Sequence, residues 1–288
     1  MTGKRYVDRF RIAPGDRVHL HKFDPGYEGK EDKKDALTKI DSLRDKMGDL
    51  QQRLFAERKR SLLVCLQALD AGGKDGVIKH VIGSMNPDGC RVANFKEPSQ
   101  EELAHDFLWR IEAQMPKKGE VAIFNRSHYE DVLIVRVHRL VSKDVWSKRY
   151  DEINDFERRH VENGTRILKF FLHISKKEQL QRFEERLDDP AKRWKISEAD
   201  YTEREHWDDY MRAYEDAIAR CNTEGSPWFV IPADHKWFRD LAISEILVAT
   251  MESMNIRVPQ PTVDIEEIRR KYHSAAAQGK RGKSRKSH

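Results

Sequence analysis

The residues best suited to chemistry lie in one glycine-rich segment, Asp70-Ala-Gly-Gly-Lys-Asp-Gly76. An apolar run at residues 62–66 precedes it and predicts a buried parallel strand, and residues 76–85 predict a helix. Because Gly72 and Gly73 have no Cβ atom, their backbone N–H groups can approach phosphate oxygens at such a turn. Lys74 adds a full positive charge there. The segment therefore predicts a phosphate-binding loop.

This loop departs from the usual pattern G-x-x-x-x-G-K-[ST] at two positions, since Ala68 replaces the first glycine and Asp75 replaces the hydroxyl residue. That hydroxyl ordinarily holds Mg²⁺, so we expect Asp70 to supply the metal-binding oxygen instead. The predicted phosphate contacts in the loop, beside Asp70 and Lys74, are Ala71, Gly72, Gly73, Asp75 and Gly76. The alternative is a strand-to-helix turn that uses glycines for shape and exposes a lysine.

Further charged groups follow two other predicted strands, at residues 90–95 and 119–124. Asn125 ends the later strand, where its amide oxygen is a weaker metal ligand than a carboxylate. Arg126 could bridge phosphate oxygens, or it could pair with Glu130 or Asp131 to hold the turn. Lys96 ends the earlier strand and is either a phosphate contact or a solvated surface lysine. These residues extend the predicted anion site.

A basic segment at residues 181–201 is the third chemical feature. Its cations are Arg182, Arg186, Lys192, Arg193 and Lys195. A charge run of this kind is either a solvated surface or a mobile lid that closes over phosphates and excludes water. We predict the lid, because the run is broken by proline and follows a strand and a helix.

The elements that must position these residues alternate between strand and helix along the chain. Five strands are predicted, at residues 62–66, 90–95, 119–124, 166–174 and 228–231. The alternation predicts an α/β protein, with a mainly parallel five-stranded sheet between two helical layers and a helical lid. We expect an N-terminal arm at residues 1–30, an α/β phosphate-loop domain at residues 31–258, and a polar basic tail at residues 259–288 that is disordered.

Composition narrows the possible functions. The 288 residues include 54 Lys and Arg against 49 Asp and Glu, so a net charge of +5 does not indicate a nucleic-acid partner. Three cysteines without metal-ligand spacing predict a reducing compartment. The chain has no apolar run of membrane-spanning length and no signal peptide, so we expect a cytoplasmic protein without a membrane partner. We find no convincing Ser-His-Asp or Cys-His arrangement for a protein nucleophile.

Three separated motifs resemble the family-2 polyphosphate kinases, with a likeness that runs from about residue 33 to residue 250. They are Ala68-Leu-Asp-Ala-Gly-Gly-Lys-Asp75, Asn125-Arg-Ser-His-Tyr-Glu-Asp131 and Asp189-Pro-Ala-Lys-Arg-Trp-Lys195. The resemblance implies phosphoryl transfer between inorganic polyphosphate and a nucleotide on a thymidylate-kinase-like fold, with Mg²⁺ or Mn²⁺. It also implies a homo-oligomer, either a dimer or a tetramer.

Residue roles follow from the same resemblance. Asp70, Lys74, Arg126 and Glu130 are implied to be catalytic, and Asp70 and Asn125 to hold the metal. The second motif is similar to the subgroup that uses both AMP and ADP, with Glu130 as a determinant of that choice. Adenine nucleotides are the expected acceptors, and guanine nucleotides are further candidates. The alternatives are an ATP-dependent kinase of another small phosphate acceptor, or a nucleic-acid binder.

Overall fold

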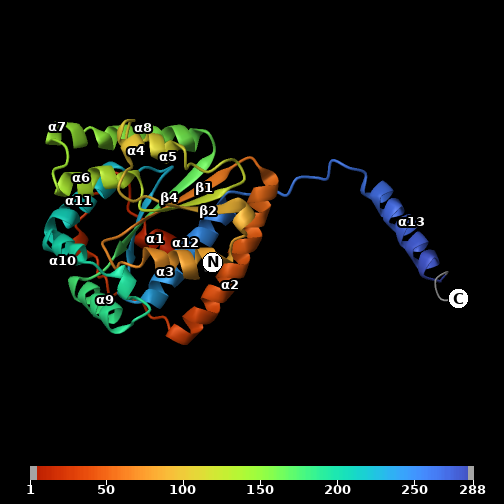
Figure 1. The fold of residues 1–288 in the computed structure, drawn as a ribbon, viewed down its shortest axis with the longest axis horizontal. Helices are drawn as coiled ribbons and strands as arrows, with labels where there is room; N and C mark the ends of the chain where they lie inside the picture. Colours follow the sequence, from red (N-terminus) through yellow and green to blue (C-terminus); the bar gives the residue numbers. More distant parts are fainter. Residues whose placement is uncertain (1–4, 285–288) are drawn as a thin grey trace. The chain divides into compact units, whose positions relative to one another are not determined.

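The computed structural model describes the backbone of residues 5–284 and the side chains of residues 5–276. The chain divides into two compact units, Met1–Ile256 and Arg257–His288. Figure 1 shows the course of the chain. None of the helices in the described residues has the length and apolar character needed to cross a bilayer.

The first unit is built on five parallel strands, as the sequence predicts. They are β1 (Ser61–Gln67), β2 (Cys90–Asn94), β3 (Val121–Asn125), β4 (Thr165–His173) and β5 (Trp228–Pro232). Their order across the sheet is β2-β3-β1-β4-β5, so β1 lies in the centre. In this register Leu66 of β1 lies opposite Asn125 of β3 and Phe170 of β4. Parallel pairing brings the carboxyl ends of all five strands to one edge, where α/β sheets bind ligands.

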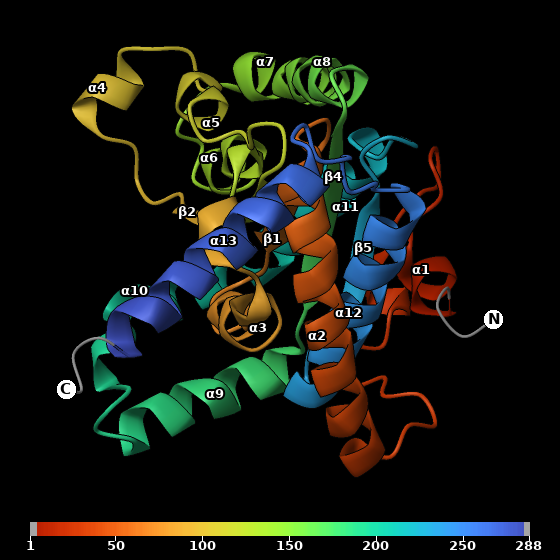
Figure 2. The same ribbon diagram turned by 90° about the vertical axis from the view of Figure 1, so that its right-hand side faces the viewer.

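Helices cover both faces of the sheet, which confirms the predicted three-layer fold. Figure 1 shows α8 (Arg149–Glu162) and α5 (Trp109–Glu112) on one side, with α2 (Lys33–Glu57), α3 (Lys74–His80) and α12 (Lys236–Ser253) on the other. Figure 2 shows α2 and α12 side by side. The remaining helices are α1 (Arg5–Phe10), η1 (Leu20–Lys22), η2 (Ile82–Ser84), η3 (Pro87–Gly89), α4 (Gln100–Leu103), η4 (His128–Val132), α6 (Ile134–Val137), α7 (Lys143–Trp146), α9 (Lys176–Asp188), η5 (Arg193–Lys195), α10 (Glu198–Glu205) and α11 (Trp207–Arg220).

Strand β1 contributes apolar side chains to two core clusters, one on each face of the sheet. Leu62, Val64 and Leu66 join the larger apolar cluster, which includes residues of α2, α3 and α12. Leu63 and Cys65 join a smaller cluster on the opposite face, with residues of α5 and α8. Side chains alternate between the faces of a strand, so a central strand between two helical layers must be apolar throughout.

The ends of the chain differ from the sequence-based expectations. Residues 1–30, which the alternation of strands and helices leaves outside the predicted domain, include α1 and η1, and the buried Tyr6, Phe10 and Leu20 join the main core. In the second unit, the prediction of a disordered tail is wrong for α13 (Ile265–Ser284). Asp264 caps this helix by accepting hydrogen bonds from Glu266 N (2.9 Å) and Glu267 N (3.1 Å), a local signal that the polar composition concealed. Residues 285–288 lie outside the described residues.

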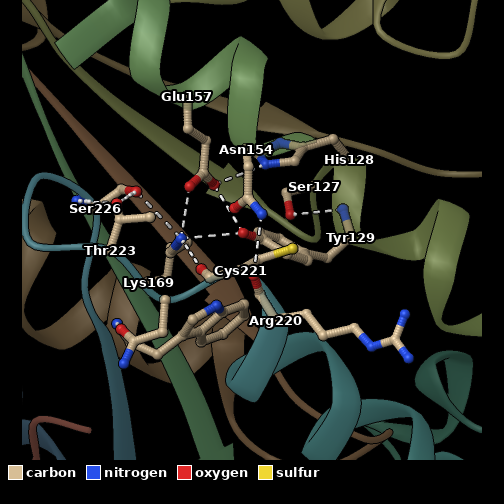
Figure 3. Close-up of polar contacts among 12 residues, drawn as sticks. Ser127, His128, Tyr129, Asn154, Glu157, Lys169, Arg220, Cys221, Thr223 and Ser226 are labelled. Carbon is tan, nitrogen blue, oxygen red and sulfur yellow. Dashed lines mark hydrogen bonds and ion pairs between the residues drawn. The ribbon is translucent and has the colours of Figure 1, made fainter. Parts of the chain in front are cut away.

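A buried polar network lies behind η4, the turn that follows β3 (Figure 3). Lys169 of β4 is fully buried, and its Nζ donates to Glu157 Oε2 (2.6 Å), Tyr129 Oη (3.0 Å) and the carbonyl oxygen of Cys221 (2.5 Å). Glu157 Oε1 accepts a hydrogen bond from Tyr129 Oη (2.8 Å) and lies 3.1 Å from His128 Nε2. Because His128 and Tyr129 belong to η4, this network fixes the turn against α8 and β4.

Glu157 titrates far from its usual range as a result. Burial by itself would raise the pKa of Glu157, but the charge of Lys169 and the hydrogen bond with His128 lower it to about 2. Because the pKa of Glu157 is lowered in the folded protein, its ion pair with Lys169 stabilises the fold at pH values above 4.5, the usual glutamate pKa. This stabilisation is lost as the pH falls toward 2.

Replacing Lys169 by Met should therefore destabilise the protein by about 3–5 kcal/mol, because the carboxylate of Glu157 is left buried without its counter-charge. Chemical denaturation at pH 7 measures this loss. The matched control is Lys148→Met at an exposed position, which should change stability by no more than about 0.5 kcal/mol.

The double variant Lys169→Met with Glu157→Leu removes both charges and should recover part of the loss. It should also lose less stability than the wild type between pH 4.5 and pH 2, where Glu157 titrates. Equal stability of Lys169→Met and Lys148→Met would show that the network does not hold the fold.

Candidate active site

The glycine-rich loop between β1 and α3 is closely packed against neighbouring side chains. Gly73 has φ 102° and precedes Lys74, the first residue of α3. A Cβ atom at Gly73 would collide with the guanidinium of Arg239, and one at Gly72 would collide with Ala68. The helix itself ends at His80, and residues 82–84 continue as the 3-10 turn η2 rather than as the predicted single helix. Gly72 and Gly73 are therefore needed for the shape of the loop.

A cavity of about 1110 Å³ opens above the loop at the carboxyl edge of the sheet. The structure brings together fourteen of the sixteen predicted site residues along its wall: Asp70, Ala71, Gly72, Gly73, Lys74, Asp75, Gly76, Lys96, Asn125, Arg126, Arg182, Arg186, Lys192 and Lys195. Glu130 and Arg193 do not line it. Residues more than a hundred positions apart in the chain thus converge on one surface, as expected for parallel strands with their carboxyl ends together.

Lys74, Asp70 and Arg126 form the charged centre of this cavity. Lys74 Nζ donates to the carbonyl oxygen of Ala68 (3.0 Å), and Arg126 Nη2 donates to Asp70 Oδ1 (3.1 Å). Burial and the nearby charge of Arg126 lower the pKa of Lys74 to about 8, although Asp70 partly offsets them. Lys74 is therefore mostly charged at neutral pH, but it loses its charge in mildly alkaline solution.

Arg126 forms the pairing within the turn that was one of its two predicted roles, and its contact with phosphate stays a prediction. Its Nη1 lies 3.5 Å from Glu130 Oε2, so the predicted pairing within the turn exists, while its Nη2 reaches Asp70 in the cavity. Burial raises the pKa of Glu130, and the charge of Arg126 opposes that rise. Arg126 has φ 62°, an uncommon value for a residue with a side chain, and its N–H donates to Leu66 O (3.1 Å) at the end of β1. Asp131 pairs instead with Arg149 (2.9 Å).

Asp75, which replaces the usual hydroxyl residue of the loop, contacts Asn125 at the end of β3. Asn125 Nδ2 donates to Asp75 Oδ1 (3.2 Å) and to Asn94 Oδ1 (2.8 Å). Lys195 Nζ donates to Asp75 Oδ2 (3.1 Å). Burial alone would raise the pKa of Asp75, but the hydrogen bond and charge of Lys195 lower it. Asp75 thus joins the ends of β2 and β3 to the segment between α9 and α10.

The cations of residues 181–201 divide into two groups. Lys195, Lys192 and Arg186 line the cavity. Arg182 also lines it, but its side chain is buried and donates to Glu178 Oε1 (2.8 Å) and to the carbonyl oxygens of Ala71 (2.8 Å) and Asp234 (3.0 Å). Arg182 therefore positions the loop in this structure, and its direct contact with phosphate stays a prediction.

Arg193 points elsewhere, since its Nε donates to the carbonyl oxygen of Leu187 (2.8 Å). The predicted phosphate contact of Arg193 is therefore not supported by its position in this structure. The sequence shows that Arg193 lies in a run of charges, but it does not show where its side chain points. That direction depends on the backbone of the 3-10 turn η5, in which Arg193 lies.

Several cavity residues were missed from the sequence. They are Asp41 and Arg44 of α2, Lys79 and His80 of α3, Asn94 of β2, and Lys236, Trp237, Arg239 and Asp240 of α12. Arg239 matters most, because it is buried against Gly73 and Gly76 and donates to Asp240 Oδ1 (2.9 Å). An arginine within the mostly apolar sequence of α12 is the local feature that could have pointed to Arg239.

The cavity offers oxygen atoms for a metal ion. Asp70 contributes a half-buried carboxylate, and Asn125 has its amide oxygen left over because its nitrogen donates to Asp75 and Asn94. Among the described residues, the cavity does not contain three clustered His, Cys, Asp or Glu ligands. This arrangement fits Mg²⁺, which binds to proteins through one or two carboxylates and completes its coordination with phosphates and water.

Comparison with known proteins agrees with this geometry. The family model described as Polyphosphate kinase 2 (PPK2) matches residues 30–259. An AMP/ADP-polyphosphate phosphotransferase of Meiothermus ruber is 50% identical over 266 residues, covering 91% of this chain and 99% of that protein. An ADP-polyphosphate phosphotransferase of Rhodopseudomonas palustris is 45% identical over 271 residues, covering 88% and 92%.

A crystal structure of polyphosphate kinase 2 from Arthrobacter aurescens superposes with a TM-score of 0.91 at 40% identity, covering 94% of this chain and 98% of that one. The resemblance carried by the three sequence motifs is thereby confirmed over almost the whole chain. With its loop, its sheet edge and its relatives all in agreement, the chain belongs to the polyphosphate kinase 2 family.

Proposed function

We propose that this protein transfers the terminal phosphoryl group of inorganic polyphosphate to AMP and ADP, forming ADP and ATP, in a reversible reaction. The observation that carries this proposal is the cation-lined cavity around Lys74 and Arg126, in a chain 50% identical to an AMP/ADP-polyphosphate phosphotransferase. A polyanionic donor requires such a lining. An ATP-dependent kinase of another acceptor and a nucleic-acid binder are not favoured.

The chemistry requires positioning and charge stabilisation more than a protein nucleophile. An oxygen of the acceptor phosphate forms a bond to the terminal phosphorus of polyphosphate. The bridging P–O bond then breaks, and its electrons leave with a chain one phosphate shorter. Lys74 and Arg126 neutralise the charge on the migrating group, while Asp70 orients the two cations and Glu130 holds Arg126 from behind.

Asp70 and the amide oxygen of Asn125 would hold Mg²⁺ or Mn²⁺ in this cavity. The metal would supply neutralisation of the charge shared between the donor and acceptor phosphates. Asp75 forms a hydrogen bond with Lys195, so it serves the closure of residues 181–201 as well as the loop.

We assign the remaining phosphate contacts from the positions of the residues that line the cavity. The loop N–H groups of Ala71, Gly73 and Gly76 would bind phosphate oxygens, and Lys96, Arg186, Lys192 and Lys195 would follow the polyphosphate chain. The predicted phosphate contact of the Gly72 N–H is not supported, because this group donates to the carbonyl oxygen of Leu69 (3.0 Å). We further propose that residues 31–258 form the kinase domain, with a lid at residues 181–201. The protein is proposed to be a dimer or tetramer. Guanine nucleotides are further candidate acceptors beside adenine nucleotides.

Purified protein incubated with Mg²⁺, long-chain polyphosphate and AMP should form ADP and then ATP, and ADP as the starting acceptor should give ATP directly. Chromatography of the nucleotides measures each product. Lys74→Met should abolish both reactions without changing the melting temperature. Product formed from ATP and a different acceptor, with none formed from polyphosphate, would contradict the proposal and favour the small-molecule kinase.

Asp70→Asn should lower kcat by about 10²–10⁴-fold, because the amide keeps the shape but removes the negative charge that faces the metal and Arg126. Kinetics at saturating ADP and polyphosphate across a Mg²⁺ titration measure the loss, and added metal should restore only part of it. Asp88→Asn, at an exposed position outside the cavity, is the matched control. A folded Asp70→Asn enzyme with near wild-type kcat would remove Asp70 from the mechanism.

The pKa of Lys74, about 8, predicts a specific pH limb. Below this value Lys74 is a cation that attracts phosphate, and above it the free enzyme loses that charge. We therefore expect kcat/KM to fall as the pH rises through 8. In Lys74→Arg the guanidinium stays charged at these pH values, so this limb should disappear even if overall activity drops. Persistence of the same limb in Lys74→Arg would assign it to another group.

A further inference from the structure

A group of potential metal ligands lies outside the active cavity, where the N-terminal arm meets α11. Val18 and Leu20 of the arm are buried, and the alternate residues His19 and His21 are exposed. The inward pair anchors the backbone, so the two imidazoles are presented on the outer side of the same short segment. Leu20 N donates to Glu215 Oε1 of α11 (2.7 Å), which brings the carboxylate to the same place.

These three side chains bring one potential ligand atom each close to a common point. One atom from each of His19, His21 and Glu215 lies within 4.8 Å of the others. Bonds of about 2.0–2.2 Å to a tetrahedral metal ion require donor atoms to lie roughly 3.3 Å apart, so small rotations of the exposed rings are sufficient. Because the hydrogen bond from Leu20 occupies Oε1, Glu215 keeps Oε2 for a metal while its orientation is fixed from behind.

We propose that His19, His21 and Glu215 bind one first-row transition-metal ion such as Zn²⁺, with a water molecule in the remaining position. Two imidazole nitrogens and one carboxylate oxygen suit Zn²⁺, Ni²⁺ or Cu²⁺, whereas Mg²⁺ prefers oxygen ligands alone. The site therefore differs in chemistry from the oxygen donors at Asp70 and Asn125. It does not depend on the proposed transfer reaction.

Occupancy of this site would tie the arm to α11. The hydrogen bond from Leu20 N to Glu215 already links the two, and a bound ion would add two further links through His19 and His21. An ion that binds the folded chain and not the unfolded chain stabilises the folded state by mass action. Zinc binding should therefore be visible as thermal stabilisation without any substrate.

Zn²⁺ is the probe, added to the full chain in the presence of excess Mg²⁺ so that oxygen-lined sites are already filled. Isothermal titration calorimetry should show saturable binding of one Zn²⁺ per chain. At free Zn²⁺ about 100-fold above Kd the melting temperature should rise by roughly 5 °C or more, and EDTA should reverse the rise. Absence of saturable binding would overturn the proposal.

Substitutions of His19, His21 and Glu215 test whether these residues bind the Zn²⁺ ion. His19→Gln with His21→Gln should weaken Zn²⁺ binding at least tenfold and abolish the thermal shift. The matched control, His105→Gln with His273→Gln, removes the same number of exposed imidazoles elsewhere and should bind like the wild type. Glu215→Gln keeps an oxygen for the Leu20 N–H and removes the charge, so it should fold normally and bind more weakly.

Unchanged binding in the His19 and His21 variant would place the zinc elsewhere and refute the site. An equal loss in the control variant would show that exposed histidines bind zinc without a defined site. Wild-type affinity in Glu215→Gln would contradict the three-ligand assignment. Each melting curve without metal reports whether the variant is folded.

Discussion

Repulsion among cations at the carboxyl edge of the sheet is the constraint on which the site depends. Lys74 and Arg126 face the same cavity, and the charge of Arg126 contributes to the lowered pKa of Lys74. Two carboxylates offset the repulsion, since Asp70 and Glu130 each contact Arg126. A polyanionic substrate would neutralise the same cations more fully. The protein without substrate thus holds a charge arrangement that phosphate binding would complete.

Buried ionic contacts keep this arrangement rigid from behind. The network of Lys169, Glu157 and Tyr129 fixes the turn that carries Arg126 and Glu130, and Arg182 fixes the loop through the carbonyl oxygen of Ala71. Neither group needs to touch substrate to matter. Phosphoryl transfer depends on the positions of charges fixed before the reaction, so the residues that hold the loop and the turn contribute as directly to the site as those that face the cavity.

Asp75, the acidic residue at the hydroxyl position of the loop, links three parts of the site. Asp75 receives hydrogen bonds from Asn125 at the end of β3 and from Lys195 between α9 and α10. An ordinary hydroxyl at position 75 could not form an ion pair with Lys195. The aspartate therefore links Lys195 to the edge of the sheet, and the amide at position 125 avoids placing a second full negative charge beside it.

The sequence alone determined the strands, the phosphate loop and the family, because these depend on local pattern. An apolar run bounded by glycines identifies β1 wherever it lies, and three motifs in order identify the family without knowledge of their contacts. Tertiary structure decided which cations face the cavity. Arg182 and Arg193 look alike in the sequence, yet one binds the loop carbonyls and the other turns away, because the direction of each depends on partners far along the chain. The same reason hid Arg239 and the pair of Lys169 with Glu157, whose roles exist only when α12, β4 and α8 pack against distant segments.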